Sequence, residues 1–302
     1  MKIIVAGGSG FIGEPLVRRF LARGDDVTVL TRNPSSVRAG RAVAWNPPAE
    51  GSWMEDVADA DAIINLAGEN VGGGRWTAAR KKRIIDSRVA ATSALVSAIA
   101  RKPGKTRTLI SASAIGIYGD RGDEQLDERS TPGSGFLAEV TKRWEELARN
   151  AEPFARVVII RIGIVLASNG GALAKLLLPF RLGAGGPMGN GRQWMSWIDR
   201  EDVLRMMEWS VDHETARGIY NAAAPAPVTN RDFAKTLGHA LHRPSILPAP
   251  AFALRLVLGS EMANEMLLGG QRVLPKRGTE EGFQFAYPGL AAALEHAVAG
   301  SG

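Results

Sequence analysis

The sequence lacks cysteine altogether and contains only four histidines among 302 residues. Without cysteine the chain can form no disulfide, no thiolate metal site and no cysteine nucleophile, which fits a reducing compartment. The histidines, at positions 213, 239, 242 and 296, are scattered, and His239 and His242 form no HExxH pattern. We therefore expect neither metal nor thiol chemistry.

Long hydrophobic runs are also absent. The most apolar stretch, residues 246–258, is interrupted by Pro248, Pro250 and Arg255 and is too short to span a bilayer. A strand pattern starts directly after the first methionine, so we expect no cleaved signal peptide. The sequence predicts a soluble, cytoplasmic protein with no membrane partner.

Charge is not strongly biased, although the formal net charge is +6. Such a charge is compatible with a polyanionic partner, but there is no zinc finger, aromatic RNA-binding signature or long basic tract. A solvated surface together with a site for a phosphorylated cofactor is the simpler interpretation. We expect a small-molecule substrate, no nucleic acid, and a monomer or homodimer.

What is present is a glycine motif near the start of the chain. Residues 3–6 form a short apolar run typical of a buried parallel strand, and residues 14–23 form an apolar-periodic helix ended by Gly24. Between them the glycines fit both GxGxxG, at residues 8–13, and GxxGxxG, at residues 7–13. Gly7 and Gly10 would permit a tight turn close to a pyrophosphate, Gly13 would let helix pack on strand, and the helix N-terminus would attract the anion. The context predicts a nucleotide site.

The end of the second predicted strand, residues 26–30, bears on the choice of cofactor. An NAD enzyme carries an acid there for the ribose 2′-hydroxyl, but this chain has no acid between Asp26 and Glu50. Arg32 can pair with a 2′-phosphate, and Arg38 is a second candidate. The alternative is that Arg32 is only a surface residue, but the upstream glycines favour NADP (NADPH).

Three further apolar segments, at residues 61–68, 108–119 and 156–166, alternate with helical patterns. This alternation predicts an α/β fold, with a Rossmann-type doubly wound parallel sheet. The first segment ends in Ala67 and Gly68, whose small size leaves room for a ribose or ring. The second runs into a hydroxyl-rich loop whose serines can bond a substrate or simply cap a turn.

The pattern changes after residue 168. We predict a cofactor domain at 1–168 with a returning strand near 216–223, a smaller substrate-side region at 169–249, and a helical C-terminal appendage at 250–302. The glycine-rich loop before Arg192, Trp194 and Trp197 suggests a wall facing substrate rather than core.

These motifs together resemble the extended short-chain dehydrogenase/reductase superfamily, the group of nucleotide-sugar epimerases and dehydratases. A narrower match is to atypical epimerase-family proteins of unsettled function that carry a short C-terminal helical domain. The segments that carry the resemblance are residues 7–13, 65–70, 75–76, 87–88, 111–119, 178–183, 197–203 and 269–275.

The resemblance implies a set of cofactor contacts along the strand ends. Gly10, Phe11 and Ile12 would lie at the pyrophosphate, Thr31 and Arg32 at the 2′-phosphate, and Leu66 and Ala67 beside the adenine ribose. Further cofactor contacts are expected from Gly7, Gly13, Gly68, Arg83, Arg88, Ser111 and Val165, the last near the nicotinamide.

One departure from the superfamily concerns catalysis. Its acid/base pair is a tyrosine followed four residues later by a lysine that lowers the pKa of the tyrosine. No Tyr-x-x-x-Lys occurs among the three tyrosines of this chain. Ser113, Tyr118 and Lys142, with Glu139, are the local candidates for proton transfer.

Two hypotheses follow for function. The chain is an NADP-dependent oxidoreductase or epimerase-like enzyme with nonstandard proton transfer, acting on a small, sugar-nucleotide-like or other substrate. Alternatively it is a catalytically silent NADP(H)-binding sensor or scaffold. Hydride transfer separates the two, and we favour the enzyme.

Overall fold

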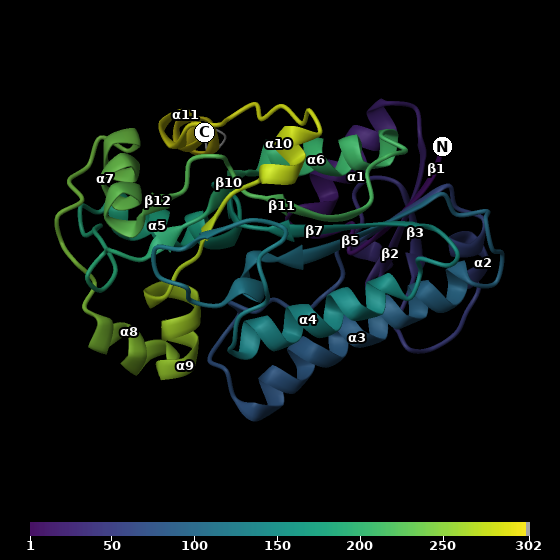
Figure 1. Ribbon diagram of the computed structural model, residues 1–302, viewed down its shortest axis with the longest axis horizontal. Helices are drawn as coiled ribbons and strands as arrows, with labels where there is room; N and C mark the ends of the chain where they lie inside the picture. The colour runs from purple at the N-terminus through teal and green to yellow at the C-terminus, as the bar shows by residue number, and fades with distance from the viewer. Residues whose placement is uncertain (300–302) are drawn as a thin grey trace.

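The computed structural model describes residues 1–299 and is built on a parallel sheet. Within that range seven strands form the sheet in the order β11-β7-β5-β4-β1-β2-β3, and every neighbouring pair is parallel (Figure 1). The strands are β1 (Lys2–Ala6), β2 (Asp26–Thr31), β3 (Arg41–Ala44), β4 (Ala62–Asn65), β5 (Thr108–Ala114), β7 (Arg156–Ile162) and β11 (Gly218–Ala222). The predicted Rossmann-type sheet is therefore confirmed.

The strand order sets the position of the site. From β1 the chain builds outward through β2 and β3, and then crosses back to β4 on the other side of β1. A crevice opens outside the carboxyl ends of the strands where the order reverses, and ligands of open α/β sheets bind there. Here that point lies between the ends of β1 and β4.

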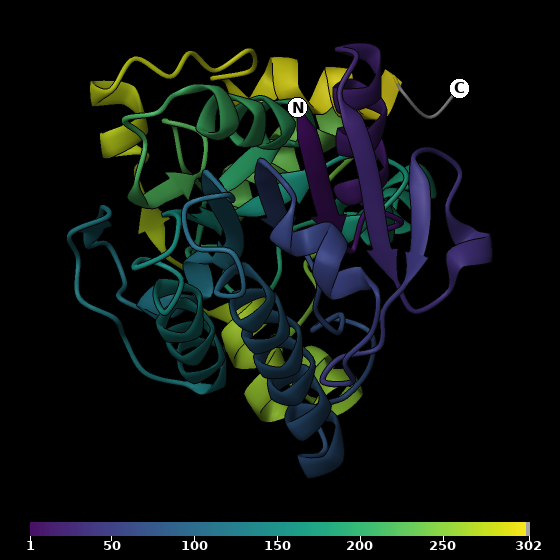
Figure 2. The ribbon, with the colours of Figure 1, turned by 90° about the vertical axis from the view of Figure 1, so that its right-hand side faces the viewer.

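Helices cover both faces of the sheet, as Figures 1 and 2 show. One face carries α1 (Gly13–Ala22) and α6 (Arg200–Asp212), and the other carries α2 (Trp53–Ala58), α3 (Ala78–Ile99) and α4 (Phe136–Arg149), with α3 and α4 packed side by side. Because both faces are covered, the central strands are buried along most of their length rather than at alternate positions.

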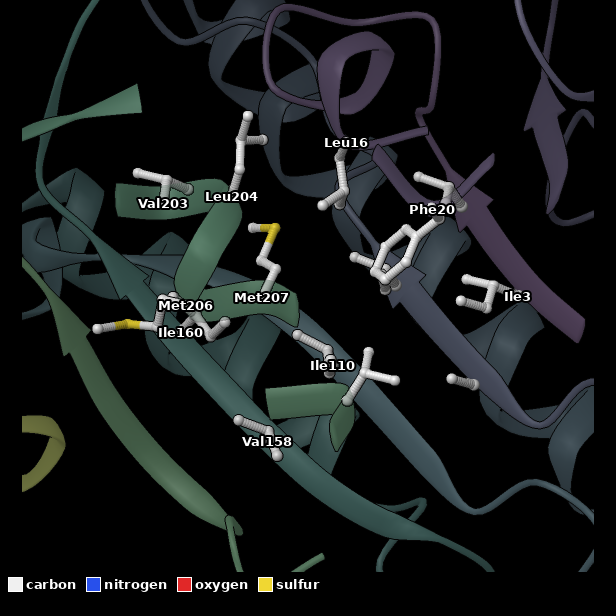
Figure 3. Close-up of a cluster of buried hydrophobic side chains, with 14 of the residues drawn as sticks. Ile3, Leu16, Phe20, Ile110, Val158, Ile160, Val203, Leu204, Met206 and Met207 are labelled. Atoms are coloured by element: carbon white, nitrogen blue, oxygen red, sulfur yellow. The ribbon is translucent and has the colours of Figure 1, made fainter. Parts of the chain in front are cut away.

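The core on the α1 and α6 side illustrates the packing. Leu16 and Phe20 of α1 and Met207 of α6 meet Ile110 and Ile160 of the sheet (Figure 3). Each of these side chains is essentially excluded from solvent. Full burial of such a side chain contributes about 1.5–3 kcal/mol, so this face holds the helices firmly on the sheet.

A smaller region lies beyond the carboxyl ends of β7 and β11. Its elements are β8 (Ile164–Leu166) paired with β10 (Trp197–Asp199), β9 (Trp194–Met195) paired with β12 (Val228–Thr229), and the helices α5 (Gly171–Arg181), α7 (Asn230–Ala240) and α11 (Leu290–Ala299). They share a separate apolar core that includes Leu173, Trp197, Phe233 and Leu294.

The C-terminal segment returns across the molecule. It contains α8 (Ala251–Leu258), α9 (Ser260–Ala263), the π-helical turn η3 (Asn264–Leu268), β13 (Arg272–Val273) and α10 (Lys276–Glu280). β13 pairs with β6 (Gln125–Leu126). The short helices η1 (Pro34–Ser36) and η2 (Ile115–Tyr118) complete the described elements.

Further along this segment, the buried carboxylate of Asp202 on α6 accepts hydrogen bonds from the backbone amides of Ala286 and Tyr287, at 2.6 and 3.0 Å. The C-terminal segment is thus fastened to the sheet domain at several points, including the β6–β13 pair and this carboxylate.

Candidate functional site

The turn after β1 is built so that only glycine fits at two of its positions. Gly7 has φ +81°, and a Cβ added there would lie 3.0 Å from the backbone carbon of Leu66. A Cβ on Gly13 would lie 2.4 Å from the carbonyl oxygen of Gly7. The first glycine makes the turn and brings β1 and β4 together at their ends, and the last brings α1 onto the turn.

The same turn presents free hydrogen-bond donors. The amide of Gly10 donates to the Gly7 carbonyl at 3.0 Å, but within residues 1–299 the amides of Phe11 and Ile12 have no acceptor. They precede the N-terminus of α1, where the helix dipole adds partial positive charge. This combination is suited to a phosphate group.

A first cavity of about 340 Å³ lies beside this turn. Seven of the predicted cofactor residues line it, and they come from the ends of three adjacent strands: Gly7, Gly10, Thr31, Arg32, Leu66, Ala67 and Gly68. The structure therefore brings the glycine turn and the expected 2′-phosphate residues to one cavity.

Arg32 is the exposed cation on the wall of this cavity. Within the described chain its guanidinium has no hydrogen-bond or ion-pair partner, so it is available to an anion. Thr31 is buried, and its hydroxyl accepts the Asn33 amide at 3.3 Å. Arg38 is exposed nearby in sequence but is not among the residues that line the cavity.

Part of the first cavity was not foreseen from the sequence. Trp45, Asn46 and Pro47 follow β3 and form one side of it. Ser87 and Ala90 of α3 also line it. The signal that could have found the first group is their position directly after a parallel strand next to β2.

Arg88 of α3 lies between the first cavity and a second one. Its Nη1 donates to the carbonyl oxygens of Glu69 and Ile84, both at 3.0 Å, and its Cζ lies 4.9 Å from the centre of the Trp144 ring. Burial lowers the pKa of Arg88 to about 10, so the guanidinium is still charged at neutral pH. Arg83 on the same helix is exposed and lines neither cavity.

The second cavity, of about 220 Å³, lies at the carboxyl ends of β5 and β7. Ala114, Gly116 and Gly163 line it from these strand ends, and α4 contributes Leu137, Val140, Thr141 and Trp144. The opposite wall is made by the loop before β9 and by residues of the C-terminal segment, namely Met188, Gln193, Trp194, Glu265, Met266, Leu267, Gly269, Gly270 and Gln271.

Glu265 joins the C-terminal segment to α4. Its two carboxylate oxygens accept the amides of Phe136 and Leu137, each at 2.9 Å, in the first turn of the helix. A carboxylate satisfies free donors there and complements the helix dipole. Sequence reasoning missed Glu265, because the contact spans almost half of the chain.

Two candidates for proton transfer belong to a buried network instead of the cavity. The Ser113 hydroxyl donates to Glu145 at 2.7 Å, and Glu145 makes two 2.8 Å hydrogen bonds with Arg161. Arg161 donates to the Tyr118 hydroxyl, which donates in turn to Asn221 at 2.8 Å. Burial is the main reason that the pKa of Tyr118 is raised, so the phenol is held protonated.

The other candidates on α4 also face away from the cavity. The ammonium of Lys142 donates to the Gly133 carbonyl at 2.9 Å, and Glu139 is exposed. On the cavity side of the helix, Leu137 and Thr141 lie one turn apart. The ionisable side chains that line the second cavity are therefore Arg88 and Glu265.

The remaining cofactor candidates, Phe11, Ile12, Gly13, Ser111 and Val165, line neither cavity. Ser111 is buried in β5, and Val165 is half-buried in β8. The Phe11 ring packs on the backbone at the start of α5, where a Cβ on Gly170 would come within 2.3 Å of it.

The predicted substrate wall is only partly present. Trp194 lines the second cavity, with its Nε1 donating to Asp123 at 2.7 Å and the Arg272 guanidinium 4.3 Å from its ring centre. Arg192 is exposed and lies outside the lining. The expectation for Trp197 is corrected: it has no exposed surface, packs in the core of the smaller region and donates to the Ala226 carbonyl.

Among residues 1–299, no three histidine, aspartate or glutamate side chains are grouped as metal ligands. No helix in that same range has the length and hydropathy needed to cross a membrane.

Comparison with known proteins gives matches over the whole chain. Residues 3–223 match the model of the NAD dependent epimerase/dehydratase family, and residues 249–297 match a domain of unknown function, DUF1731. The epimerase family protein SDR39U1 of Bos taurus is 37% identical, over 99% of this chain and 100% of its own.

Two solved structures superimpose on this chain. The human epimerase family protein SDR39U1 (isoform 2), crystallised with NADPH, superimposes with a TM-score of 0.90 at 33% identity over 99% of both chains. A nucleoside-diphosphate sugar epimerase of Corynebacterium glutamicum gives 0.78 at 31% identity, over 98% of this chain and 57% of its own. With a family model covering most of its length and relatives that align from end to end, this chain belongs to the NAD-dependent epimerase/dehydratase family.

Proposed function

We propose that this protein binds NADP(H) in the first cavity and exchanges hydride with a small substrate in the second, as an oxidoreductase or epimerase-like enzyme. The observation that carries the cofactor assignment is the meeting of the glycine turn and the unpaired Arg32 on one cavity. The NADPH present in the crystals of the human relative supports the same assignment.

Residues that line the first cavity, and the adjacent Phe11, Ile12 and Gly13 of the turn, suit the parts of this cofactor. The free amides of Phe11 and Ile12 would hold the pyrophosphate, Thr31 and Arg32 the 2′-phosphate, and Leu66 and Ala67 the adenine ribose. Gly7, Gly13 and Gly68 keep the backbone close, and Arg88, Ser111 and Val165 would lie toward the nicotinamide, although of these three only Arg88 lines a cavity. The bound cofactor supplies the hydride that is donated or accepted.

Proton transfer does not follow the superfamily pattern in this proposal. Ser113, Tyr118 and Lys142 already bond to groups of the protein, so we assign them to structure. Leu137 and Thr141 face the cavity from α4 and offer no ionisable group. This observation favours the alternative function, a catalytically silent NADP(H) sensor or scaffold, and makes a hydride-transfer test necessary.

Cofactor choice is tested by fluorescence titration of NADPH and NADH. We expect NADPH to bind more tightly than NADH, and Arg32→Ala to weaken NADPH by about 10- to 100-fold, the effect of losing one charge-assisted phosphate contact. NADH affinity should barely change. Arg149→Ala removes a cation from another part of the surface and serves as the control. Equal affinity of the wild type for the two cofactors would contradict the assignment.

The enzyme and the sensor are separated by a single-turnover experiment. NADPH-loaded protein is mixed with a panel of small aldehydes and ketones, and the absorbance of the reduced nicotinamide is followed. Oxidation by any compound above the rate of free NADPH supports the enzyme. Tight NADPH binding with no oxidation across the panel supports the sensor.

A further inference from the structure

The second cavity is unlike a nucleotide-sugar site in both size and lining. Ligand pockets for drug-sized molecules usually measure about 300–1,000 Å³, whereas this cavity measures about 220 Å³, part of which a nicotinamide ring would take. Much of its wall is apolar, with side chains such as Leu137, Val140, Ile164, Met195 and Met266. It suits a small, largely apolar molecule.

Several polar side chains on its wall are already bonded to the protein. Thr141 donates to a carbonyl of its own helix, and Gln193 donates to two backbone carbonyls. Trp194 donates to Asp123, and Glu265 accepts two amides. Few groups are left to pair with the many hydroxyls of a sugar.

Two donors on the same wall are exceptions. Nε of Arg88 and Nε1 of Trp144 are shielded from solvent and, within residues 1–299, neither has an acceptor. Trp144 is only 6% exposed. Buried donors in proteins are almost always paired, so two orphans on one cavity point to an acceptor that comes from a ligand.

The charge of Arg88 leads to the same conclusion. Its hydrogen bonds go to two neutral carbonyl oxygens, and no carboxylate within residues 1–299 forms an ion pair with it. The Glu69 carboxylate attracts this half-buried guanidinium without forming an ion pair with it, and a bound anion would supply the direct counterion. Arginine presents donors in a planar fork that matches a carboxylate.

We propose that the second cavity binds a small, mainly apolar carboxylate, with its carboxylate group received by the Arg88 guanidinium and the Trp144 indole N–H. This inference rests on the proposed function, since it names the substrate class of the same site. It also predicts that nucleotide sugars are rejected, which separates this chain from the nucleoside-diphosphate sugar epimerase that it resembles in fold.

The same two donors could instead serve the cofactor's pyrophosphate, which is also an oxyanion. Trp144→Phe tests whether the donors serve a substrate carboxylate or the pyrophosphate, because it keeps an aromatic ring against Arg88 but deletes the N–H. Arg88→Lys keeps a positive charge but loses the fork. Trp209→Phe, on a tryptophan packed against Tyr220 and Phe283 outside the cavity, is the matched control.

The experiment is isothermal titration of NADP⁺-loaded protein with benzoate, benzamide and UDP-glucose. We expect benzoate to bind, and the neutral amide and the nucleotide sugar to bind at least tenfold more weakly. Trp144→Phe and Arg88→Lys should each weaken benzoate about tenfold, the loss of one hydrogen bond to a charged group. Trp209→Phe should leave benzoate affinity unchanged.

NADPH titration of the same samples separates the possible failures. Unchanged NADPH affinity in Trp144→Phe together with weakened benzoate supports the proposal. If Trp144→Phe or Arg88→Lys weakens NADPH binding while benzoate binds no better than benzamide, the proposal is overturned. The two donors then belong to the cofactor site. Wild-type protein that binds benzoate but not NADPH contradicts the proposed function and leaves the carboxylate subsite standing.

Discussion

The two cavities are built by different means. The first is formed at a glycine turn and at the ends of β1, β2, β3 and β4, and its lining residues all lie between positions 7 and 91. The second draws its lining from segments far apart in the sequence, from Val71 to Gln271. The first cavity thus depends on one local stretch of the chain, whereas the second depends on distant segments that meet only in the folded chain.

The largest expected effect comes from breaking the backbone of the first cavity. In Gly13→Ala the added Cβ would lie 2.4 Å from the Gly7 carbonyl oxygen, so the turn has to open. We expect NADPH affinity to fall at least about 100-fold and the free energy of unfolding to fall by about 1–3 kcal/mol, as for overpacking. Fluorescence titration and urea unfolding measure the two effects.

A control for this variant is Gly289→Ala, since a Cβ there meets no atom within 4 Å. It should change neither quantity. If Gly13→Ala bound NADPH normally, the close packing of helix and turn would not be what shapes the cofactor site.

The second prediction separates the buried network around Arg161 from the groups that line the first cavity. Arg161→Met removes the partner of the buried Glu145 carboxylate, and breaking such a pair costs about 3–5 kcal/mol. NADPH affinity should change less than about twofold if folding is retained, because Arg161 does not line the first cavity. Urea unfolding and NADPH titration provide the measurements.

Lys82→Met is the comparison for that pair. It breaks an exposed ion pair with Asp86 one turn away on α3 and should cost less than about 1 kcal/mol. Similar losses in the two variants would mean that the buried network is not a source of stability.

The smallest effect is expected where the C-terminal segment meets α4. Glu265→Ala removes the acceptor for two amides in the first turn, and loss of such a cap costs about 0.5–2 kcal/mol. Hydrogen exchange of the Phe136 and Leu137 amides should speed up while NADPH affinity is unchanged. Glu261→Ala, which breaks only the exposed ion pair with Lys81, should leave those amides protected.

Sequence reasoning succeeded where the determinants are local. The parallel sheet was predicted correctly, because apolar strands alternating with helices are visible within short windows. Gly7, Gly10 and Arg32 proved to lie on one cavity because the ends of adjacent parallel strands meet at one edge of the sheet. That relation follows from topology and requires no knowledge of side-chain packing.

It failed where burial or long-range contact decides. Trp197 was expected to face substrate because it follows a glycine-rich loop, but the β8–β10 pairing turns it into the core. The contact of Glu265 with α4 joins residues 128 positions apart, so no local pattern indicates it. The assignment of the proton-transfer residues and of the substrate-facing residues was therefore the weakest part of the sequence-based interpretation.

The placement of β13 and η3 has a consequence for biosynthesis. The seven strands of the sheet and the whole lining of the first cavity are translated before residue 223, whereas the segment carrying Glu265 and Gln271 leaves the ribosome later. A nascent chain can therefore assemble the first cavity while one wall of the second is still unmade. Under the proposed function, hydride transfer would be enclosed only once the chain has been extended past Gln271.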